Sequence, residues 1–412
     1  MIRLLHIADV HFDTGFACKS DEIREALRVA VRDAFSLVVD DAVRLRVDAL
    51  LIAGDLLDDE HLRLDTERFL FEQVSRLGAE GIPVVYVTGN HDPGSPKARI
   101  RELRWPDNVT FIGDRNPTVV ELQTRGGKLR VVGAGHDMSR LGENLAATFP
   151  RFDDQIPTVG LLHANVDSCT SDDHGRYAPC SIADLESRRY DYWALGHIHA
   201  PGPVRGSQAI WYAGCLQGRH FREDGLRGAC LVSMGSLSPS GTQTTVELKS
   251  YAPIRWEKVV VDNVGRFRGA SQLDDAVARE VEAVVRRASG VRLAVRVTLR
   301  GETELWRSLT DADERGELED QWREKLNLLY VEVDASQTYR PLNIAALRDE
   351  PTVLSEALSL IDEIAAGGTP AKALLREVLQ VGARATEVDG LDLVGEPEIL
   401  RRSLAERFSG GN

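Results

Sequence analysis

Apolar residues follow two different spacings along roughly the first 250 positions of the chain. Short continuous apolar runs, typical of strands buried on both faces, alternate with longer segments in which apolar residues recur every three or four positions, typical of amphipathic helices. The apolar runs cover 2–8, 49–53, 84–87, 159–162 and 192–195, and the helical segments cover 21–45 and 65–77. This alternation predicts an α/β fold in which helices pack on a sheet.

The pattern becomes richer in short strands after residue 105. Glycine, proline and asparagine turns separate expected strands at 109–112, 118–123, 128–134 and 208–213. The polar stretch 234–244 predicts a hairpin tip. Two sheets packed face to face, with helices outside, are therefore the expected architecture of this part, a β-sandwich flanked by helices.

A second unit is expected to begin near residue 251. Strands at 256–261, 291–299 and 328–333, with helices at 271–287 and 311–325, predict a small α+β domain. After Pro341 the spacing predicts helices at 351–365, 370–379 and 395–407. The predicted organisation is a domain over 1–250, a small capping domain over 251–338, and a helical tail over 339–412 that binds a partner.

Composition narrows the class of protein. A chain of 412 residues is expected to form two or three domains, and its net charge of −14 argues against binding nucleic acid through bulk charge alone. Bound divalent ions would reverse the local field at a site, so a nucleic-acid enzyme stays possible. The five cysteines include no Cys-x-x-Cys pair, which favours a reducing cytoplasm. No apolar run is long enough to predict a membrane span.

Polar residues with metal-binding chemistry follow each of the five apolar runs. They are Asp9-Val10-His11, Gly54-Asp55, Gly89-Asn90-His91-Asp92, His163 and Gly196-His197-Ile198-His199. Because strand ends of a layered sheet converge on one rim, these stretches are expected to meet in space. Oxygen and imidazole ligands without thiolates, in a number sufficient for two ions, indicate a dinuclear hydrolytic site.

Each stretch alone has an ordinary structural explanation. Asp-x-His can be a polar pair at a strand end, Gly-Asp is a common turn, and Gly-Asn-His-Asp can be an Asx turn. All five in this order, each after a strand, favour the metal site. Two ions about 3.5–4 Å apart can activate a water and neutralise a phosphoryl group. His91 remains as a group that contacts the phosphate or protonates the leaving oxygen, and Asp92 could orient His91 or a ligand.

These stretches in this order resemble the calcineurin-like metallophosphoesterases over about residues 1–230. The resemblance implies two divalent ions, Mn2+ first, with Mg2+, Fe2+ or Zn2+ as alternatives. It implies one ion on Asp9, His11, Asp55 and His199, and a second on Asp55, Asn90, His163 and His197, with Asp55 bridging. It also implies His91 as the catalytic acid or the transition-state stabiliser.

Longer segments look like the SbcD-type DNA-repair exonucleases, particularly the YhaO-like bacterial subgroup. They are 2–13, 51–58, 86–92 and 192–199, together with His-Ala-Asn-Val-Asp at 163–167 and Gly-Cys-Leu-Gln-Gly-Arg-His-Phe-Arg-Glu at 214–223. This resemblance implies a capping domain, then helices that dock on an SbcC-like coiled-coil ABC-type ATPase, and a homodimer formed through the nuclease domain. The C-terminal segments fit by order alone.

Four further positions are candidates for the second shell or for substrate contact. Asp58 stands three residues after Asp55, where some nucleases of this group have a histidine linked to exonuclease action. His136 either lines the site or is a loop histidine, and Arg219 and His220 either meet a substrate phosphate or hydrogen-bond a hairpin.

The sequence therefore predicts a metal-dependent DNA exonuclease, with endonuclease action as an option, that serves DNA repair and recombination beside an ATPase. One rival is a phosphomonoesterase or cyclic-nucleotide phosphodiesterase, against which the long C-terminal extension argues. The other rival is a non-catalytic scaffold on the same fold, against which the complete ligand set argues.

Overall fold

The computed structural model describes residues 1–16, 20–58, 62–92, 100, 102–166, 177–205, 207–238, 241–288, 290–341 and 353–365. The chain divides into two compact units. The first comprises Met1–Val261, Asp274–Leu299 and Asp313–Asp334, and the second comprises Asp262–Leu273, Arg300–Ala312 and Ala335–Asn412. No helix among the described residues is long and apolar enough to cross a membrane. The domain boundaries expected from the sequence stay a prediction.

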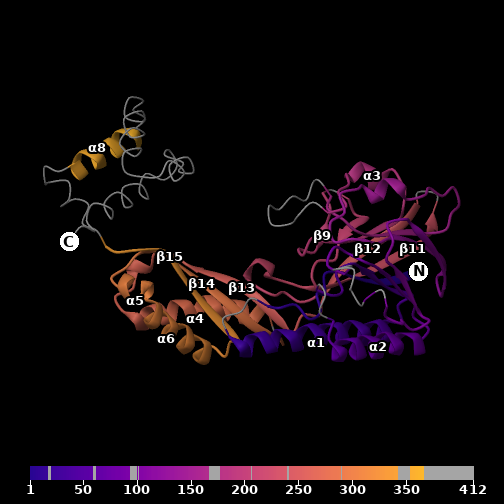
Figure 1. The fold of residues 1–412 in the computed structure, drawn as a ribbon. Helices are drawn as coiled ribbons and strands as arrows, with labels where there is room; N and C mark the ends of the chain where they lie inside the picture. Colours follow the sequence, from indigo (N-terminus) through magenta and orange to yellow (C-terminus); the bar gives the residue numbers. More distant parts are fainter. Residues whose placement is uncertain are drawn as a thin grey trace. The chain divides into compact units, whose positions relative to one another are not determined.

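A six-stranded mixed sheet carries the N-terminal strand of the first unit (Figure 1). Its order is β12-β11-β1-β2-β3-β4. The strands are β1 (Ile2–Ile7), β2 (Ala49–Ala53), β3 (Val84–Val87), β4 (Val109–Ile112), β11 (Gly228–Ser238) and β12 (Gly241–Ser250). Strands β1 to β4 are parallel, and β11 runs antiparallel to both β1 and β12. The ends of β1, β2 and β3 therefore point to the same edge.

A second six-stranded sheet forms the other layer. Its order is β5-β6-β7-β8-β10-β9. The strands are β5 (Thr118–Thr124), β6 (Gly127–Ala134), β7 (Thr158–His163), β8 (Tyr192–Gly196), β9 (Gly202–Pro203) and β10 (Ile210–Tyr212). Strands β6, β7, β8 and β10 are parallel, while β5 and β9 are antiparallel edge strands. The ends of β7 and β8 thus also share one edge.

Burial on both faces of the strands explains their continuous apolar runs. In β1, Leu4 belongs to a buried cluster shared with Val131 and Leu161 of the second sheet, whereas its neighbour Leu5 belongs to a cluster shared with the helix residue Leu27. Successive side chains of a strand point to opposite faces, so one run serves two hydrophobic layers. The predicted two-sheet sandwich with outer helices is confirmed.

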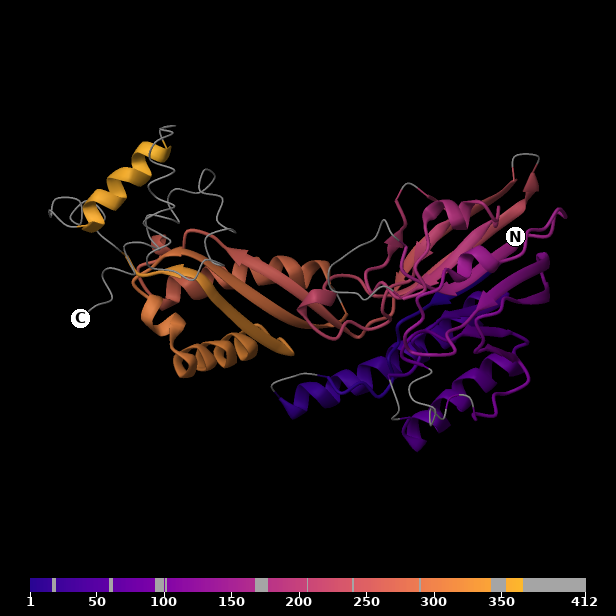
Figure 2. The same ribbon diagram turned by 45° about the horizontal axis from the view of Figure 1, so that its top comes forward.

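Two helices cover the free face of the first sheet, as both views show (Figures 1 and 2). Helix α1 (Asp21–Leu45) has the predicted bounds, and α2 (Leu64–Ala79) is slightly longer than predicted. The Ser20 side chain accepts a hydrogen bond from the backbone of Glu22 at 3.2 Å, a typical N-cap. A short helix α3 (Ile182–Glu186) contributes Leu185 to the cluster on the outer face of the second sheet.

The predicted elements after residue 251 are present in the described part of the chain. They are β13 (Ile254–Val261), α4 (Ala270–Arg287), β14 (Arg292–Glu302), α5 (Trp306–Thr310), α6 (Ala312–Lys325), β15 (Tyr330–Tyr339) and α8 (Val353–Ala365). Strands β13, β14 and β15 form one sheet, in which β13 and β14 are parallel. The helices predicted at 370–379 and 395–407 lie outside the described residues.

The prediction of a hairpin tip over 234–244 was too long. Strands β11 and β12 continue to pair as far as Ser238 and Gly241, after a change of register between Met234 and Leu237. Turn residues alone suggested a loop, but threonine-rich polar segments pair well in an antiparallel ladder, so backbone pairing extends through them.

Candidate metal centre

The ends of five strands bring the predicted site residues together across the two sheets. Asp9 follows β1, and its backbone N–H donates to the Gly54 carbonyl after β2 at 3.1 Å. The backbone N–H of His197, after β8 of the other sheet, lies 3.1 Å from each carboxylate oxygen of Asp9. His163 is the last residue of β7. Segments up to 188 residues apart therefore meet at one rim.

Four of the predicted ligands have a left-handed backbone. The φ angles are 50° at Asp9, 51° at His11, 50° at Asp55 and 103° at His197. Non-glycine residues avoid this region because it costs roughly 1–2 kcal/mol per residue. Such strain persists where the surrounding structure enforces it, frequently at functional sites. Here it turns the chain sharply at the ends of three strands.

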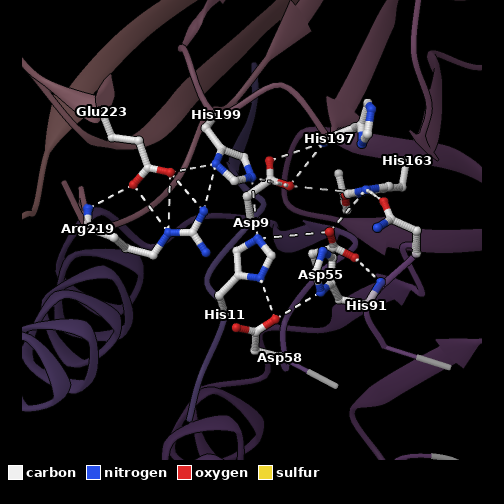
Figure 3. A network of polar contacts seen from close by, with 12 residues as sticks. Asp9, His11, Asp55, Asp58, His91, His163, His197, His199, Arg219 and Glu223 are labelled. Atoms are coloured by element: carbon white, nitrogen blue, oxygen red, sulfur yellow. Dashed lines mark hydrogen bonds and ion pairs between the residues drawn. The ribbon is translucent and has the colours of Figure 1, made fainter. Parts of the chain in front are cut away.

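The first group of candidate ligands contains two imidazoles that face each other. The Nε2 atoms of His11 and His199 lie 3.4 Å apart, and Nε2 of His199 lies 3.9 Å from the Asp9 carboxylate (Figure 3). Asp9, His11 and His199 can offer ligand atoms to one cation. Two neutral imidazole nitrogens that both point inward as acceptors require a shared positive partner, so this donor set fits a divalent ion.

The second group is built around His163. Its Nδ1–H donates to the Ala53 carbonyl at 2.9 Å, which turns Nε2 toward the Asn90 side-chain oxygen at 3.0 Å and the Asp55 carboxylate at 3.3 Å. The same Asp55 oxygen lies 3.9 Å from Nε2 of His11 in the first group. Asp55 therefore lies between the two groups, in the position that a bridging carboxylate needs.

His197 is the one predicted ligand whose side chain does not join either group. Its ring packs edge-on against His163 at 5.3 Å and against Tyr177 at 5.6 Å between centroids. Figure 3 shows the ring at the margin of the cluster. Among the described residues, no candidate cation group includes it. Rotation of its side chain would be required for ligation, whereas its backbone N–H already binds Asp9.

His91 and Asp58 form a pair at the open side of the cluster. Nδ1 of His91 lies 2.8 Å from the Asp58 carboxylate, which is also 3.5 Å from Nδ1 of His11. The backbone N–H of His91 donates to Asp55 at 2.8 Å. Burial raises the pKa of Asp58, but the hydrogen bonds from both histidines outweigh it and hold this pKa well below its usual range. The carboxylate is thus ionised and fixes the orientation of His91.

Asp92 binds backbone amides. Its side chain accepts from the N–H groups of Asp55 at 2.8 Å, Leu57 at 3.0 Å and Gly89 at 2.7 Å. These contacts join the chain exits of β2 and β3, so Asp92 orients the segments that carry Asp55 and Asn90. Burial and the nearby charge of Asp55 raise its pKa to about 6.

His136 lies behind His163. Its Nε2 is 2.8 Å from the His163 carbonyl, and the two rings meet edge to edge with centroids 5.5 Å apart. The imidazole is fully buried, and burial lowers its pKa to about 4. A neutral His136 supports the end of β7 instead of contacting either group of candidate ligands.

The segment after β10 adds a residue that the sequence did not single out. Arg219 lies 2.9 Å from Nδ1 of His199 and forms an ion pair with Glu223 at 2.8 Å. Glu223 itself lies 2.6 Å from the same Nδ1 and is buried. Glu223 ends the charged run Arg-His-Phe-Arg-Glu, which is typical of a solvated turn, so no local signal marked it. His220 is largely exposed and lines, with Arg219, a pocket of about 430 Å³.

Three glycines permit this close packing. A Cβ atom on Gly54 or Gly89 would come closer than 3.0 Å to Nδ1 of His163, and one on Gly196 would overlap the Ala53 carbonyl. Each glycine directly precedes a predicted ligand. Their role is therefore steric, because the backbones of neighbouring loops approach one another too closely for a side chain.

Without a cation, a proton compensates part of the charge of the centre. Burial raises the pKa of Asp9. Burial lowers the pKa of His163, but the charges of Asp55 and Asp9 outweigh it and raise this pKa to about 9. A protonated His163 between two aspartates thus occupies the electrostatic position that a cation would take.

Comparison with known proteins identifies the family. Residues 2–201 match the family model of the calcineurin-like phosphoesterases, and residues 256–336 match that of the middle domain of metallophosphoesterase YhaO. The chain is 30% identical over 314 residues to the uncharacterized metallophosphoesterase YhaO of Bacillus subtilis, which covers 74% of this chain and 73% of that protein. The chain belongs to the calcineurin-like phosphoesterases, which are dinuclear metal-dependent hydrolases, as the sequence predicted.

Two further relatives carry nuclease or repair names. The DNA double-strand break repair protein Mre11 of Aeropyrum pernix is 32% identical over 222 residues, 49% of this chain and 50% of that protein. The D subunit of the nuclease SbcCD of Bacillus subtilis is 24% identical over 290 residues, 62% of this chain and 72% of that protein. This chain thus spans half the length of the Mre11 relative.

Substitution Gly196→Ala should damage the centre because the new Cβ would overlap the backbone of β2. We expect the free energy of unfolding to fall by about 1–3 kcal/mol and cation binding to weaken. Gly142→Ala is the control, since a Cβ added there would meet nothing within 4 Å. Chemical denaturation and cation titration of both variants would measure this. Equal stability of the two variants would contradict the steric argument.

The pH dependence of stability should change sign when a divalent cation is added. The raised pKa of His163 stabilises the cation-free protein fully below about pH 6.5, and this contribution is lost as the pH rises toward about 9. Cation binding needs the deprotonated imidazole and therefore strengthens over the same interval. Melting temperatures from pH 6.5 to 9, with chelator or with Mn2+, should diverge as the pH rises. Parallel curves would show that His163 does not bind the cation.

Proposed function

We propose that this protein is a dinuclear metal-dependent DNA exonuclease, with endonuclease cleavage as a second mode, that hydrolyses phosphodiester bonds in DNA repair and recombination. The observation that carries the proposal is the position of Asp55, within 3.9 Å of His11 and 3.3 Å of His163. One carboxylate between two ligand groups suits a pair of cations acting on a phosphodiester. The relatives named as Mre11 and as the D subunit of SbcCD favour DNA as the substrate.

The proposed ligands follow the two groups. Asp9, His11, Asp55 and His199 hold one ion, and Asp55, Asn90, His163 and His197 hold the other after the His197 ring rotates. Mixed oxygen and imidazole donors suit Mn2+, with Fe2+, Zn2+ and Mg2+ as alternatives. When bound, two such ions supply an activated water and neutralise the charge of the phosphoryl group.

His91 is the proposed catalytic residue of the chain itself. Asp58 accepts the Nδ1–H of His91 at 2.8 Å, so the opposite ring nitrogen, Nε2, is the one directed toward a substrate. From there it can donate a hydrogen bond to a non-bridging oxygen or transfer a proton to the leaving oxygen. Asp58 is a positioning residue that keeps the ring oriented, the role left open by the sequence.

Arg219 and His220 are proposed to contact a backbone phosphate of the DNA. They line the pocket of about 430 Å³, to which Arg222 and Arg296 also contribute. Arginines bind phosphate oxygens in a fork geometry. This gathering of cations beside the centre contrasts with the net charge of −14 and favours a polyanionic substrate over a small one.

The proposed partners are DNA, an SbcC-like coiled-coil ATPase and a second copy of the chain. The name of the SbcCD relative and the match to the YhaO middle domain support an assembly of this kind. Helix α8, in which Leu358 and Ile361 are buried, belongs to the tail proposed to bind the ATPase. We propose the cytoplasm as the location, since the described cysteines Cys180, Cys215 and Cys230 are unpaired thiols.

A substrate comparison tests the proposal directly. With Mn2+, the protein should degrade linear duplex or single-stranded DNA faster than bis-p-nitrophenyl phosphate, p-nitrophenyl phosphate or a cyclic nucleotide, because the cationic pocket adds binding energy for a polymer. Removal of the ions with a chelator should abolish cleavage, and added Mn2+ should restore it. Cleavage of the small esters without cleavage of DNA would assign a phosphomonoesterase or cyclic-nucleotide activity instead.

Substitution of His91 should separate catalysis from cation binding. His91→Ala should keep both ions and lower kcat about 10²–10⁴-fold, because a general acid or phosphate-binding group is lost while the proposed ligands remain. Asp58→Asn should lower kcat less, since it disturbs only the orientation of the ring. Asp55→Ala is the reference variant that should lose both ions in calorimetric titration. DNA cleavage by His91→Ala at the wild-type rate would remove this residue from the mechanism.

A further inference from the structure

Glu223 is a buried carboxylate in direct contact with the imidazole of His199. Its side chain is only 4% exposed, and Oε1 lies 2.6 Å from Nδ1 of His199. The same carboxylate accepts hydrogen bonds from the backbone N–H of Arg219 at 2.7 Å and from its guanidinium at 2.8 Å. A buried charge of this kind is costly unless it is paired and hydrogen-bonded. Arg219 supplies that compensation, so Glu223 can remain an anion beside the centre.

The two neighbours of Nδ1 favour opposite tautomers of His199. Arg219 can only donate, so a hydrogen bond from its guanidinium to Nδ1 would place the imidazole proton on Nε2. Nε2 would then point an N–H group at His11 and Asp9. Glu223 can only accept, so it requires the proton on Nδ1 and leaves the lone pair of Nε2 directed into the cluster. The contact with Glu223 is the shorter of the two, 2.6 Å against 2.9 Å, and Arg219 already donates to Glu223.

Backbone contacts fix the distance between Glu223 and His199. The buried guanidinium of Arg227 donates to the His199 carbonyl at 2.6 Å and to the Glu223 carbonyl at 3.2 Å. On the far side of the loop, the indole N–H of Trp256 donates to the Gly218 carbonyl at 2.8 Å. The segment that carries Glu223 is therefore held at both ends, and the carboxylate is placed before any cation binds.

The other histidine of the centre that is oriented through Nδ1 has a different partner. His163 donates its Nδ1–H to the backbone carbonyl of Ala53, which no side-chain substitution can remove. Only the group of Asp9, His11 and His199 relies on a side-chain carboxylate for this purpose. Partners of this kind, which hold a ligating imidazole from behind, typically contribute 10–100-fold to metal affinity.

We propose that Glu223 is a positioning residue of the metal centre, which accepts the Nδ1–H of His199 and selects the tautomer whose Nε2 binds the cation shared with Asp9 and His11. The inference rests on the two-ion centre of the proposed function, but not on DNA as the substrate. It assigns one of the two cation sites, and not the other, to the control of a residue that touches neither cation nor substrate.

Calorimetric titration of the chelator-treated full chain with Mn2+ tests the proposal without any measurement of activity. In Glu223→Ala, one of the two sites should lose about 10–100-fold in affinity, while the other stays within twofold of the wild type. Glu223→Gln keeps an oxygen that can accept from Nδ1 and should show a smaller loss at the same site. The unaffected site is an internal control for folding. Glu257→Ala, which removes a partly buried glutamate paired with Arg255, is the matched control and should leave both sites unchanged.

A second readout reports the tautomer itself. In protein loaded with diamagnetic Zn2+, the 15N chemical shifts of the His199 imidazole should show a protonated Nδ1 in the wild type and in Glu223→Gln. Wild-type affinity at both sites of Glu223→Ala would overturn the proposal. Equal weakening of both sites would also overturn it, because that result indicates a general structural role. A wild-type chain that binds two ions, depends on Glu223 at one of them and fails to cut DNA would contradict the nuclease proposal alone.

Discussion

Two buried carboxylates at the junction of two sheets constrain the rest of this structure. Asp9 and Asp55 are 1% and 2% exposed and lie among the imidazoles of His11, His163 and His199. Buried anions are stable only with compensating positive charge and hydrogen bonds. In the absence of a cation, a protonated His163 provides part of that charge, so the centre is arranged around a position where positive charge is required.

The fold supplies this arrangement through its strand ends. Parallel neighbours β1 and β2 and the facing pair β7 and β8 end at one rim, and left-handed residues and glycines let their loops approach closely. A further set of carboxylates holds these loops in place from behind. Asp92 binds the backbones after β2 and β3, Asp58 orients His91, and Glu223 contacts His199. Each acidic residue thus has a different task although all lie within one cluster.

Much of this could be predicted from the sequence because periodicity reports which faces of an element are buried. It predicted the bounds of α1, the strand order along the chain and the polar residues that end each strand. It could not identify Glu223, because a charged run is identical in sequence whether it is solvated or folded back onto a histidine. The ring orientation of His197 and the support of His163 by His136 were equally inaccessible, since both depend on packing between distant segments. The overlong hairpin tip arose because turn-forming residues do not exclude backbone pairing.

The central claim is that the carboxylate of Asp55 joins two cations. A crystal structure of the Mn2+-loaded protein, with anomalous diffraction measured at the manganese edge, tests it most directly. The account predicts two anomalous peaks about 3.5–4 Å apart on either side of Asp55, one beside Nε2 of His199 and the other beside Nε2 of His163. A single peak, or peaks distant from Asp55, would contradict it.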